Sequence, residues 1–206
     1  MTPASAILVP RDGILVSAKV TLPILGIDLE TTGLKQQDGD RIVEIAMVEM
    51  LYETWSGRGF IKRSLVQRVN PLRPIHPAAE AVHGISMAML KDEPVWEDVA
   101  SRVLDFMQGA RLLIAHNMEF DGPFLAGELL RVGLHPPEVP TLCTMKSARW
   151  ATPMGKLPKL SELCFASGVS YNPEEAHSAE YDIKRTLACL KRGLANGYYH
   201  LPEESL

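Results

Sequence analysis

The sequence has only three cysteines, Cys143, Cys164 and Cys189, among its 206 residues. Their number is odd and no CxxC pair occurs, which argues against a disulfide framework or a zinc site built on thiolates. The chain also lacks any apolar run near the roughly 18 residues that a transmembrane helix requires. Its first residues, MTPASAILVPRDG, place no positive charge before their short apolar patch, so we expect no signal peptide. These absences predict a cytoplasmic protein without a membrane span.

The sequence also lacks an excess of positive charge. Lysine and arginine number 21 against 25 acidic residues, so the formal net charge is -4. Proteins that bind long duplex DNA through its phosphates are usually basic, so this balance argues against that class. It still allows an enzyme that binds a few nucleotides, because acidic metal ligands lower the net charge and bound cations restore it locally.

No internal repeat, low-complexity tract or long linker divides the chain. A length of 206 residues with 46% hydrophobic and 22% charged residues is typical of one globular domain. Proline and glycine interrupt residues 1–22, which we predict to form an N-terminal arm or an extra strand pair. We assign residues 23–197 to the main domain and residues 198–206 to a short C-terminal tail.

The apolar pattern predicts strands first, then strands and helices together. Three runs, PILGIDLE, RIVEIAMVEM and GFIKRSLVQRVN, follow one another across short turns, so we expect antiparallel pairing. Helices are expected in EPVWEDVASRVLDFMQG, EFDGPFLAGELLRVG, KLPKLSELCFASG and AEYDIKRTLACLKRG, with short strands at RLLIAHN and VPTLCT. Pro123 is tolerated in its helix if it lies in the first turn, and we place the end of the last helix at Gly193 or Gly197. This order predicts an α/β fold with a mixed sheet between helices.

Four acidic residues stand near the ends of these elements. Asp28 and Glu30 close the first strand, and residues two apart on a strand point to the same face. Asp121 lies near a helix start, where the helix dipole alone would also favour an acid. Asp182 lies in the last helix, five positions after His177. We place His177 in the preceding loop, because a spacing of five does not put two residues on one helical face.

Clustered carboxylates repel one another, and burial increases this cost. Divalent cations remove it, and oxygen ligands suit Mg²⁺ or Mn²⁺ rather than a soft metal. Four carboxylates can hold two ions about 4 Å apart, the arrangement that supports in-line attack of water on a phosphodiester. A nearby imidazole can accept the proton of that water near neutral pH. The set therefore predicts metal-dependent hydrolysis of phosphodiesters.

Four motifs, IDLETTG, VHGIS, AHNMEFD and HSAEYD, closely resemble in order and spacing those of the DEDDh exonucleases. Within that superfamily the chain is most similar to the group of the proofreading (epsilon) subunit of bacterial DNA polymerase III and ribonuclease T. The resemblance runs from Ile24 to Leu194. It implies an RNase H-like fold, with a mixed five-stranded sheet whose first three strands are antiparallel and which helices flank.

The resemblance also implies roles for individual residues. It matches Asp28, Glu30, Asp121 and Asp182 to the four metal-binding acids, and His177 to the general base. A sister subfamily has a tyrosine four residues before the last acid. Here that position is Ser178, and Tyr181 is wrongly spaced, so we assign the histidine class. Contacts to the terminal nucleotide are implied for Thr31, Gly33, Leu34, His83, Asn117 and Phe120.

The implied activity is a 3′→5′ exonuclease that degrades single-stranded or frayed DNA to nucleoside 5′-monophosphates. Its cofactors would be two Mg²⁺ ions, with Mn²⁺ as a substitute. The same chemistry would serve an exoribonuclease that trims RNA, because sugar discrimination needs only small changes near the 2′ position. A third alternative is a proofreading or binding subunit attached to a polymerase or other replication partner. The sequence has no obvious clamp-binding peptide of the Gln-Leu-Phe type, which favours a nuclease that acts alone or one attached to a partner by an unrecognised surface. Superfamily members often dimerise, so a homodimer stays open.

Some of these residues have a structural alternative. His116, at a strand end, is a second candidate base, although we favour a structural or substrate-side role. His83 has an alternative role as a cap of the turn before Gly84. One basic run is either a solvated face or a contact to substrate phosphates: Lys146, Arg149, Lys156 and Lys159.

Overall fold

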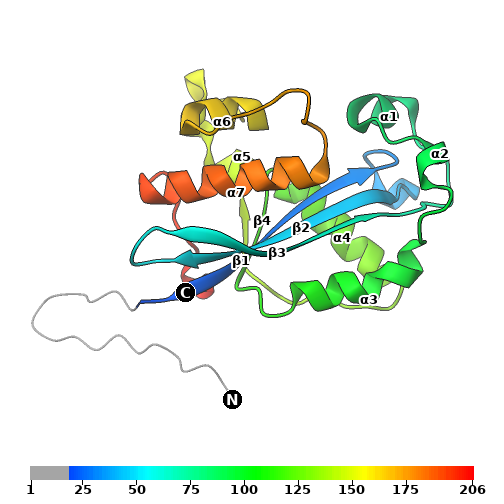
Figure 1. Cartoon of the computed structure of the whole chain (residues 1–206), viewed down its shortest axis with the longest axis horizontal. Helices are drawn as coiled ribbons and strands as arrows, with labels where there is room; N and C mark the ends of the chain where they lie inside the picture. The colour runs from blue at the N-terminus through cyan, green and yellow to red at the C-terminus, as the bar shows by residue number, and fades with distance from the viewer. Residues whose placement is uncertain (1–18) are drawn as a thin grey trace, which may run out of the picture.

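The structure is a computed structural model that describes residues 19–206, and its centre is a five-stranded mixed sheet (Figure 1). The strands are β1 (Thr21–Thr31), β2 (Ile42–Glu53), β3 (Gly59–Arg68), β4 (Leu112–Ala115) and β5 (Thr141–Cys143). Their order in the sheet is β3-β2-β1-β4-β5. The first three strands pair antiparallel, while β4 lies parallel to β1 and β5 parallel to β4. The predicted mixed sheet with three antiparallel strands first is confirmed.

Helices cover both faces of this sheet (Figure 1). α3 (Trp96–Met107) and α4 (Met118–Arg131) pack on one face, and α6 (Leu160–Ser167) and α7 (Ala179–Ala195) pack on the other. α1 (Pro77–His83) and α2 (Met87–Leu90) follow β3, and α5 (Thr144–Ser147) follows β5. Four short 3₁₀ segments complete the described chain: η1 (Gln36–Asp38), η2 (Arg149–Ala151), η3 (Pro153–Gly155) and η4 (Glu203–Ser205).

The alternation of side chains along β1 divides the core into two layers. Leu22 and Ile24 pack with α6 and α7, whereas Leu25 and Ile27 pack with α3 and α4. At Gly26 the helix α7 comes very close, because an added Cβ would lie 2.7 Å from the Ile183 side chain. Glycine at this position therefore allows α7 to pack directly on β1, just before the two acids that end the strand.

The structure settles two details of the predicted helices. α4 begins at Met118, so Pro123 lies in its second turn rather than its first. There the proline cannot donate a hydrogen bond to the Glu119 carbonyl, a loss that the rest of the helix must offset. The last helix ends at Ala195, so Gly193 lies within it, and Gly197 follows with a φ of 73°.

The two ends of the described chain join the domain. β1 starts at Thr21, before the predicted domain start, and residues 1–18 of the predicted arm lie outside the described residues. In the predicted tail, Tyr199 is buried in the core and its hydroxyl donates to the Thr144 carbonyl at 3.2 Å. None of the helices in residues 19–206 combines the length and apolar character that a membrane crossing requires. The cytoplasmic location stays a prediction.

Candidate active site at the end of strand β1

Four acidic side chains meet near the C-terminal end of β1. Asp28 and Glu30 alternate with the residues that face α3 and α4, so they point to the α7 side of the sheet. Asp182 lies in the first turn of α7 and Asp121 in the first turn of α4. These two helices pack on opposite faces, and their N-terminal ends both reach the end of β1. The acids predicted from the sequence are therefore brought together by three different elements.

The negative charges of this cluster act on one another. Burial raises the pKa of Asp28 well above its usual range, and the charges of Asp121, Glu30 and Asp182 raise it further. Burial, Asp182 and Glu44 raise the pKa of Glu30 to about 8. Burial also raises the pKa of Asp121 to about 7, although hydrogen bonds from the Leu29 and Asp121 backbone N–H groups oppose the rise. The cluster therefore favours bound protons or cations.

No lysine or arginine in the described part of the chain supplies a counter-charge for these four acids. Within residues 19–206, neither lysine nor arginine forms an ion pair with any of them. Buried carboxylates ordinarily have such partners, because an unpaired buried charge is costly. The lack of such partners for these four acids is a physical reason to expect an external cation.

His177 and Asp182 are joined through the backbone. The His177 N–H donates to Asp182 Oδ2 at 3.1 Å, which opposes the rise in the pKa of Asp182 that burial causes. His177 is exposed and has a φ of 63°, a left-handed conformation that few non-glycine residues adopt. It precedes α7, so the predicted loop position of the histidine and helix position of the acid are confirmed. Strained backbone of this kind is concentrated at functional sites.

The donor set fits hard divalent cations. All four side chains offer carboxylate oxygens, the ligands that Mg²⁺ and Mn²⁺ prefer. Asp182 Oδ1 is buried and has no hydrogen-bond partner, as an oxygen reserved for an ion would be. In residues 19–206, no three His, Cys, Asp or Glu side chains are grouped so that they could hold an ion as they stand. The carboxylates would have to draw together around one.

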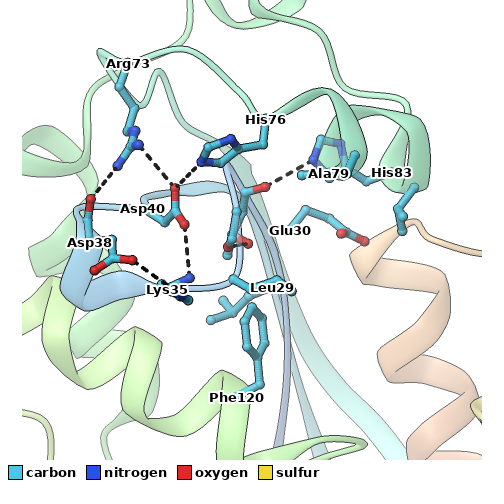
Figure 2. A pocket seen from close by; sticks show the side chains of 15 residues that line it. Leu29, Glu30, Lys35, Asp38, Asp40, Arg73, His76, Ala79, His83 and Phe120 are labelled. Carbon is cyan, nitrogen blue, oxygen red and sulfur yellow. Dashed lines mark hydrogen bonds and ion pairs between the residues drawn. The ribbon is translucent and has the colours of Figure 1, made fainter.

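A cavity of about 680 Å³ opens beside Glu30, between the loop after β1 and helix α1 (Figure 2). Its apolar walls come from Leu29, Leu34, Ala78, Ala79, Val82 and Phe120. Lys35, Arg73 and His76 add basic side chains to the lining. An apolar cavity with a few polar groups is typical of a small-ligand site, and its volume suits a nucleotide.

Five of the six predicted substrate contacts line this cavity: Thr31, Gly33, Leu34, His83 and Phe120. Leu34 is 82% exposed, so its side chain is free to contact a ligand. The sixth, Asn117, is outside the lining and precedes α4 as an exposed residue. Its side chain has no assigned contact in the cavity, and its role stays a prediction.

His83 connects the cavity to His177. Its Nδ1 accepts the Ile85 N–H at 3.0 Å, so Nε2 carries the hydrogen and donates to the Thr31 carbonyl at 3.2 Å. Burial lowers the pKa of His83, which favours this neutral form. His83 also borders a second cavity of about 670 Å³, which His177 lines. His83 therefore stabilises the turn that follows it and lies between the two cavities.

Comparison with known proteins identifies the family. Residues 25–190 match the family model described as Exonuclease. The chain belongs to this exonuclease family. It is 35% identical over 166 residues to the DNA polymerase III subunit epsilon of Pasteurella multocida (strain Pm70), across 77% of this chain and 62% of that protein. The exonuclease therefore spans less than two thirds of the length of this relative.

Solved structures support the same assignment. Exonuclease X in complex with 5′ overhanging duplex DNA has a TM-score of 0.62 and 31% identity, over 86% of this chain and 94% of that one. The nuclease domain of 3′hExo, a DEDDh family member bound to rAMP, has a TM-score of 0.69 at 20% identity, over 89% and 97% of the two chains. The second likeness shows the fold alone. The resemblance to the exonuclease family of the epsilon subunits and the RNase H-like fold are thereby confirmed, and the histidine class stays a prediction.

His116 of this exonuclease has a structural environment. Its Nδ1 lies 3.1 Å from Thr144 Oγ1, and its Nε2 donates to the Pro158 carbonyl at 3.2 Å. Burial lowers the pKa of His116 to about 4. Both ring nitrogens are therefore occupied, and the ring links β4 to the segments after β5. This agrees with the structural role that the sequence favoured over a base.

Two further acids, Glu44 and Asp40, lie near the site and were not among the predicted site residues. Glu44 on β2 is the cross-strand partner of Glu30, and its Oε2 accepts a hydrogen bond from Arg68 Nε at 3.0 Å. Asp40 is buried below the loop that follows Glu30. A charge inside the apolar run IVEIAMVEM was a usable signal for Glu44. Asp40 stands in a polar loop sequence, QQDGDR, which gave no sign that its side chain is buried.

Proposed function

We propose that this chain is a metal-dependent 3′→5′ exonuclease that removes nucleoside 5′-monophosphates from the 3′ end of DNA. One observation carries this proposal: a carboxylate cluster without counter-charge stands directly beside an apolar cavity. Glu30 belongs to both. A terminal nucleotide in the cavity would therefore bring its phosphate to the carboxylates.

We assign the acids to metal binding. Asp28, Glu30, Asp121 and Asp182 would hold two divalent cations, Mg²⁺ or, as a substitute, Mn²⁺. Bound there, the cations would supply positive charge for activating water and stabilising the leaving oxygen. The four acids come from β1, α4 and α7, so their relative positions depend on the packed core rather than on a flexible loop.

His177 is assigned as the general base. His177 is exposed beside the cluster, and the hydrogen bond from its backbone N–H to Asp182 holds its backbone next to that acid. An imidazole there could accept the proton of the attacking water through a ring nitrogen at neutral pH. His83 is less suited to this task, because both of its ring nitrogens already have partners.

The cavity is assigned to the terminal nucleotide. Leu34, Val82 and Phe120 offer apolar surface on which a base can stack in a sequence-independent way. Thr31 and Gly33 line the same cavity beside Glu30. The cavity would therefore hold the terminal residue while its phosphodiester reaches the acids.

DNA is the proposed substrate, because the named relatives are subunits of DNA polymerase III and the exonuclease X structure contains DNA. RNA trimming is the alternative, since 3′hExo was solved with rAMP. The relatives' names also support a polymerase partner, which co-purification from cells would test. A homodimer stays a prediction, and light scattering of the purified protein would measure it.

The direct test uses purified protein and single-stranded DNA labelled at its 5′ end. With Mg²⁺ we expect a ladder that shortens from the 3′ end, and 3′-labelled DNA should release labelled mononucleotide at once. EDTA should stop both reactions. A matched RNA oligonucleotide in the same reaction measures the sugar preference. If neither Mg²⁺ nor Mn²⁺ supports cleavage of DNA or RNA, the proposed function is wrong.

A further inference from the structure

Asp40 is a buried carboxylate below the loop that carries the proposed nucleotide contacts. It is 4% exposed, although its neighbours in the loop are polar. Its Oδ1 accepts the Thr32 hydroxyl at 2.9 Å and its Oδ2 accepts the Lys35 N–H at 3.0 Å. These two hydrogen bonds tie Thr32 and Lys35, the residues on either side of Gly33 and Leu34, to the Asp40 side chain.

Asp40 also connects this loop to the opposite wall of the cavity (Figure 2). Arg73 Nη2 lies 3.3 Å and His76 Nε2 3.5 Å from Asp40 Oδ1. The His76 backbone N–H in turn donates to the Thr32 carbonyl at 2.9 Å. Because His76 immediately precedes α1, Asp40 helps to set how far the loop stands from that helix.

Gly33 shows how closely the loop rests on this carboxylate. A Cβ at Gly33 would lie 2.4 Å from Asp40 Oδ2 and 2.5 Å from the His76 ring. The Gly33 backbone therefore lies directly against the Asp40 carboxylate and the His76 ring. The next residue, Leu34, projects into solvent with 82% of its surface exposed. An exposed contact residue needs such a support to keep one position.

We propose that Asp40 is a positioning residue for the terminal nucleotide. Asp40 lines the cavity, but its two oxygens are engaged by the loop and by the segment that precedes α1, so it acts by holding Thr32 to Lys35 in the conformation that presents Gly33 and Leu34 to the nucleotide. This inference rests on the proposed exonuclease function. The position requires a carboxylate, because each of its two oxygens accepts from a donor and an amide has only one accepting oxygen.

The first test compares Asp40→Asn with Asp38→Asn. Asp38 lies in the same loop and, like Asp40, lines the cavity, but its carboxylate is exposed and pairs only with Lys35, at 3.5 Å. For Asp40→Asn we expect the KM for single-stranded DNA to rise about tenfold, with a much smaller change in kcat. For Asp38→Asn we expect a change of less than about twofold. A fall in kcat at unchanged KM, or equal effects of the two variants, would overturn the inference.

Binding without turnover gives a second readout. A dye-labelled oligonucleotide with a phosphorothioate at its last linkage can be titrated and followed by fluorescence anisotropy. The Kd for Asp40→Asn should rise by the same factor as the KM. An unchanged Kd would overturn the inference.

The coupling between Asp40 and Leu34 tests the mechanism itself. If Asp40 acts by positioning the loop, Leu34→Ala in the Asp40→Asn background should weaken DNA binding no further than the worse single variant. Losses that multiply would mean that the two residues act independently. That outcome would contradict positioning even if both single variants bind weakly.

Thr32 supplies the test if Asp40→Asn does not fold. Thr32→Val removes the hydroxyl that donates to Asp40, and Thr32→Ser keeps it. Weaker binding in the valine variant with recovery in the serine variant supports the inference, and equal binding in both overturns it. Wild-type protein that cleaves nothing would instead refute the proposed function, so the two failures are distinguishable.

Discussion

Acidic side chains at two places in this molecule have opposite surroundings. Glu128 on α4 is 1% exposed, and its two oxygens accept from Arg41 Nε at 2.5 Å and Arg131 Nε at 3.2 Å. The acids at the end of β1 have no lysine or arginine partner within residues 19–206. Both groups lose hydration, and only Glu128 recovers the loss from charges of the chain itself. No lysine or arginine side chain in this part of the chain balances the acids at the end of β1, and this points to a bound metal ion as their partner.

This contrast separates a structural acid from a functional one. Arg41 joins Glu128 of α4 to the start of β2, and Arg131 pairs with Glu128 within α4, so removing a charge there should weaken the fold. The acids near Asp28 repel one another, and removing one should relieve the fold while abolishing the chemistry. Strained sites of this kind are expected where function requires groups that stability does not.

The largest expected effect is that of Asp28→Asn. The variant loses a metal-binding oxygen at the centre of the cluster, so the cleavage rate should fall about 10⁴-fold or more. Its melting temperature in EDTA should stay the same or rise, because one source of repulsion is gone. Single-turnover kinetics measure the cleavage rate, Mn²⁺ titration calorimetry measures the metal affinity, and thermal melts in EDTA measure the stability. A folded variant that cleaves at the wild-type rate would refute the assignment.

His177→Ala separates the base from the ligands. We expect a loss of about 10²- to 10⁴-fold in kcat. Mn²⁺ affinity should be retained, because the contact to Asp182 uses the backbone N–H that alanine keeps. His177→Gly is the control for the left-handed backbone and should be equally slow. Unchanged turnover in both variants, across neutral pH, would count against the base role.

Glu128→Gln tests the opposite side of the comparison. It leaves two arginines beside a buried neutral group, so the free energy of unfolding should fall by about 3 kcal/mol. Urea unfolding measures this, and kcat should not change. Glu97→Gln is the matched control, since Glu97 pairs with the same Arg131 but is 47% exposed. Its cost should be less than about 1 kcal/mol. Equal costs would show that burial is not the deciding factor.

The smallest expected effect is a pH dependence of the metal-free protein. The pKa of Glu30 is about 8 in the fold against 4.5 when unfolded, so between these values the folded state binds more protons. The free energy of unfolding should therefore fall as pH rises from 4.5 to about 8. Melting curves in EDTA should move down by a few degrees over this range. Saturating Mg²⁺ should remove most of the shift, and Glu30→Gln should flatten it. A melting temperature that rises with pH in EDTA would contradict the sign.

The sequence predicted much of this site because local periodicity carries the necessary information. Period two along a strand puts Asp28 and Glu30 on one face. The five-residue spacing of His177 and Asp182 separates a loop residue from a helix residue, and the structure agrees. The turn of the helix that holds Pro123 could not be predicted, for the opposite reason. Where a helix begins depends on what the preceding strand packs against, and Met118 starts α4 directly after the turn that follows β4.

The sequence by itself determined the order of the elements, the shared face of Asp28 and Glu30 and the oxygen character of the ligand set. These depend on neighbours in the chain. Only the tertiary structure decided that α4 and α7, from opposite faces of the sheet, bring Asp121 and Asp182 to the same strand end. It also decided that His116 is fully bonded to Thr144 and Pro158, and that Asp40 lies buried below Gly33. Such contacts join residues far apart in the chain or turn a polar loop inward. They depend on close approaches, such as that of Ile183 to Gly26, which no local pattern specifies.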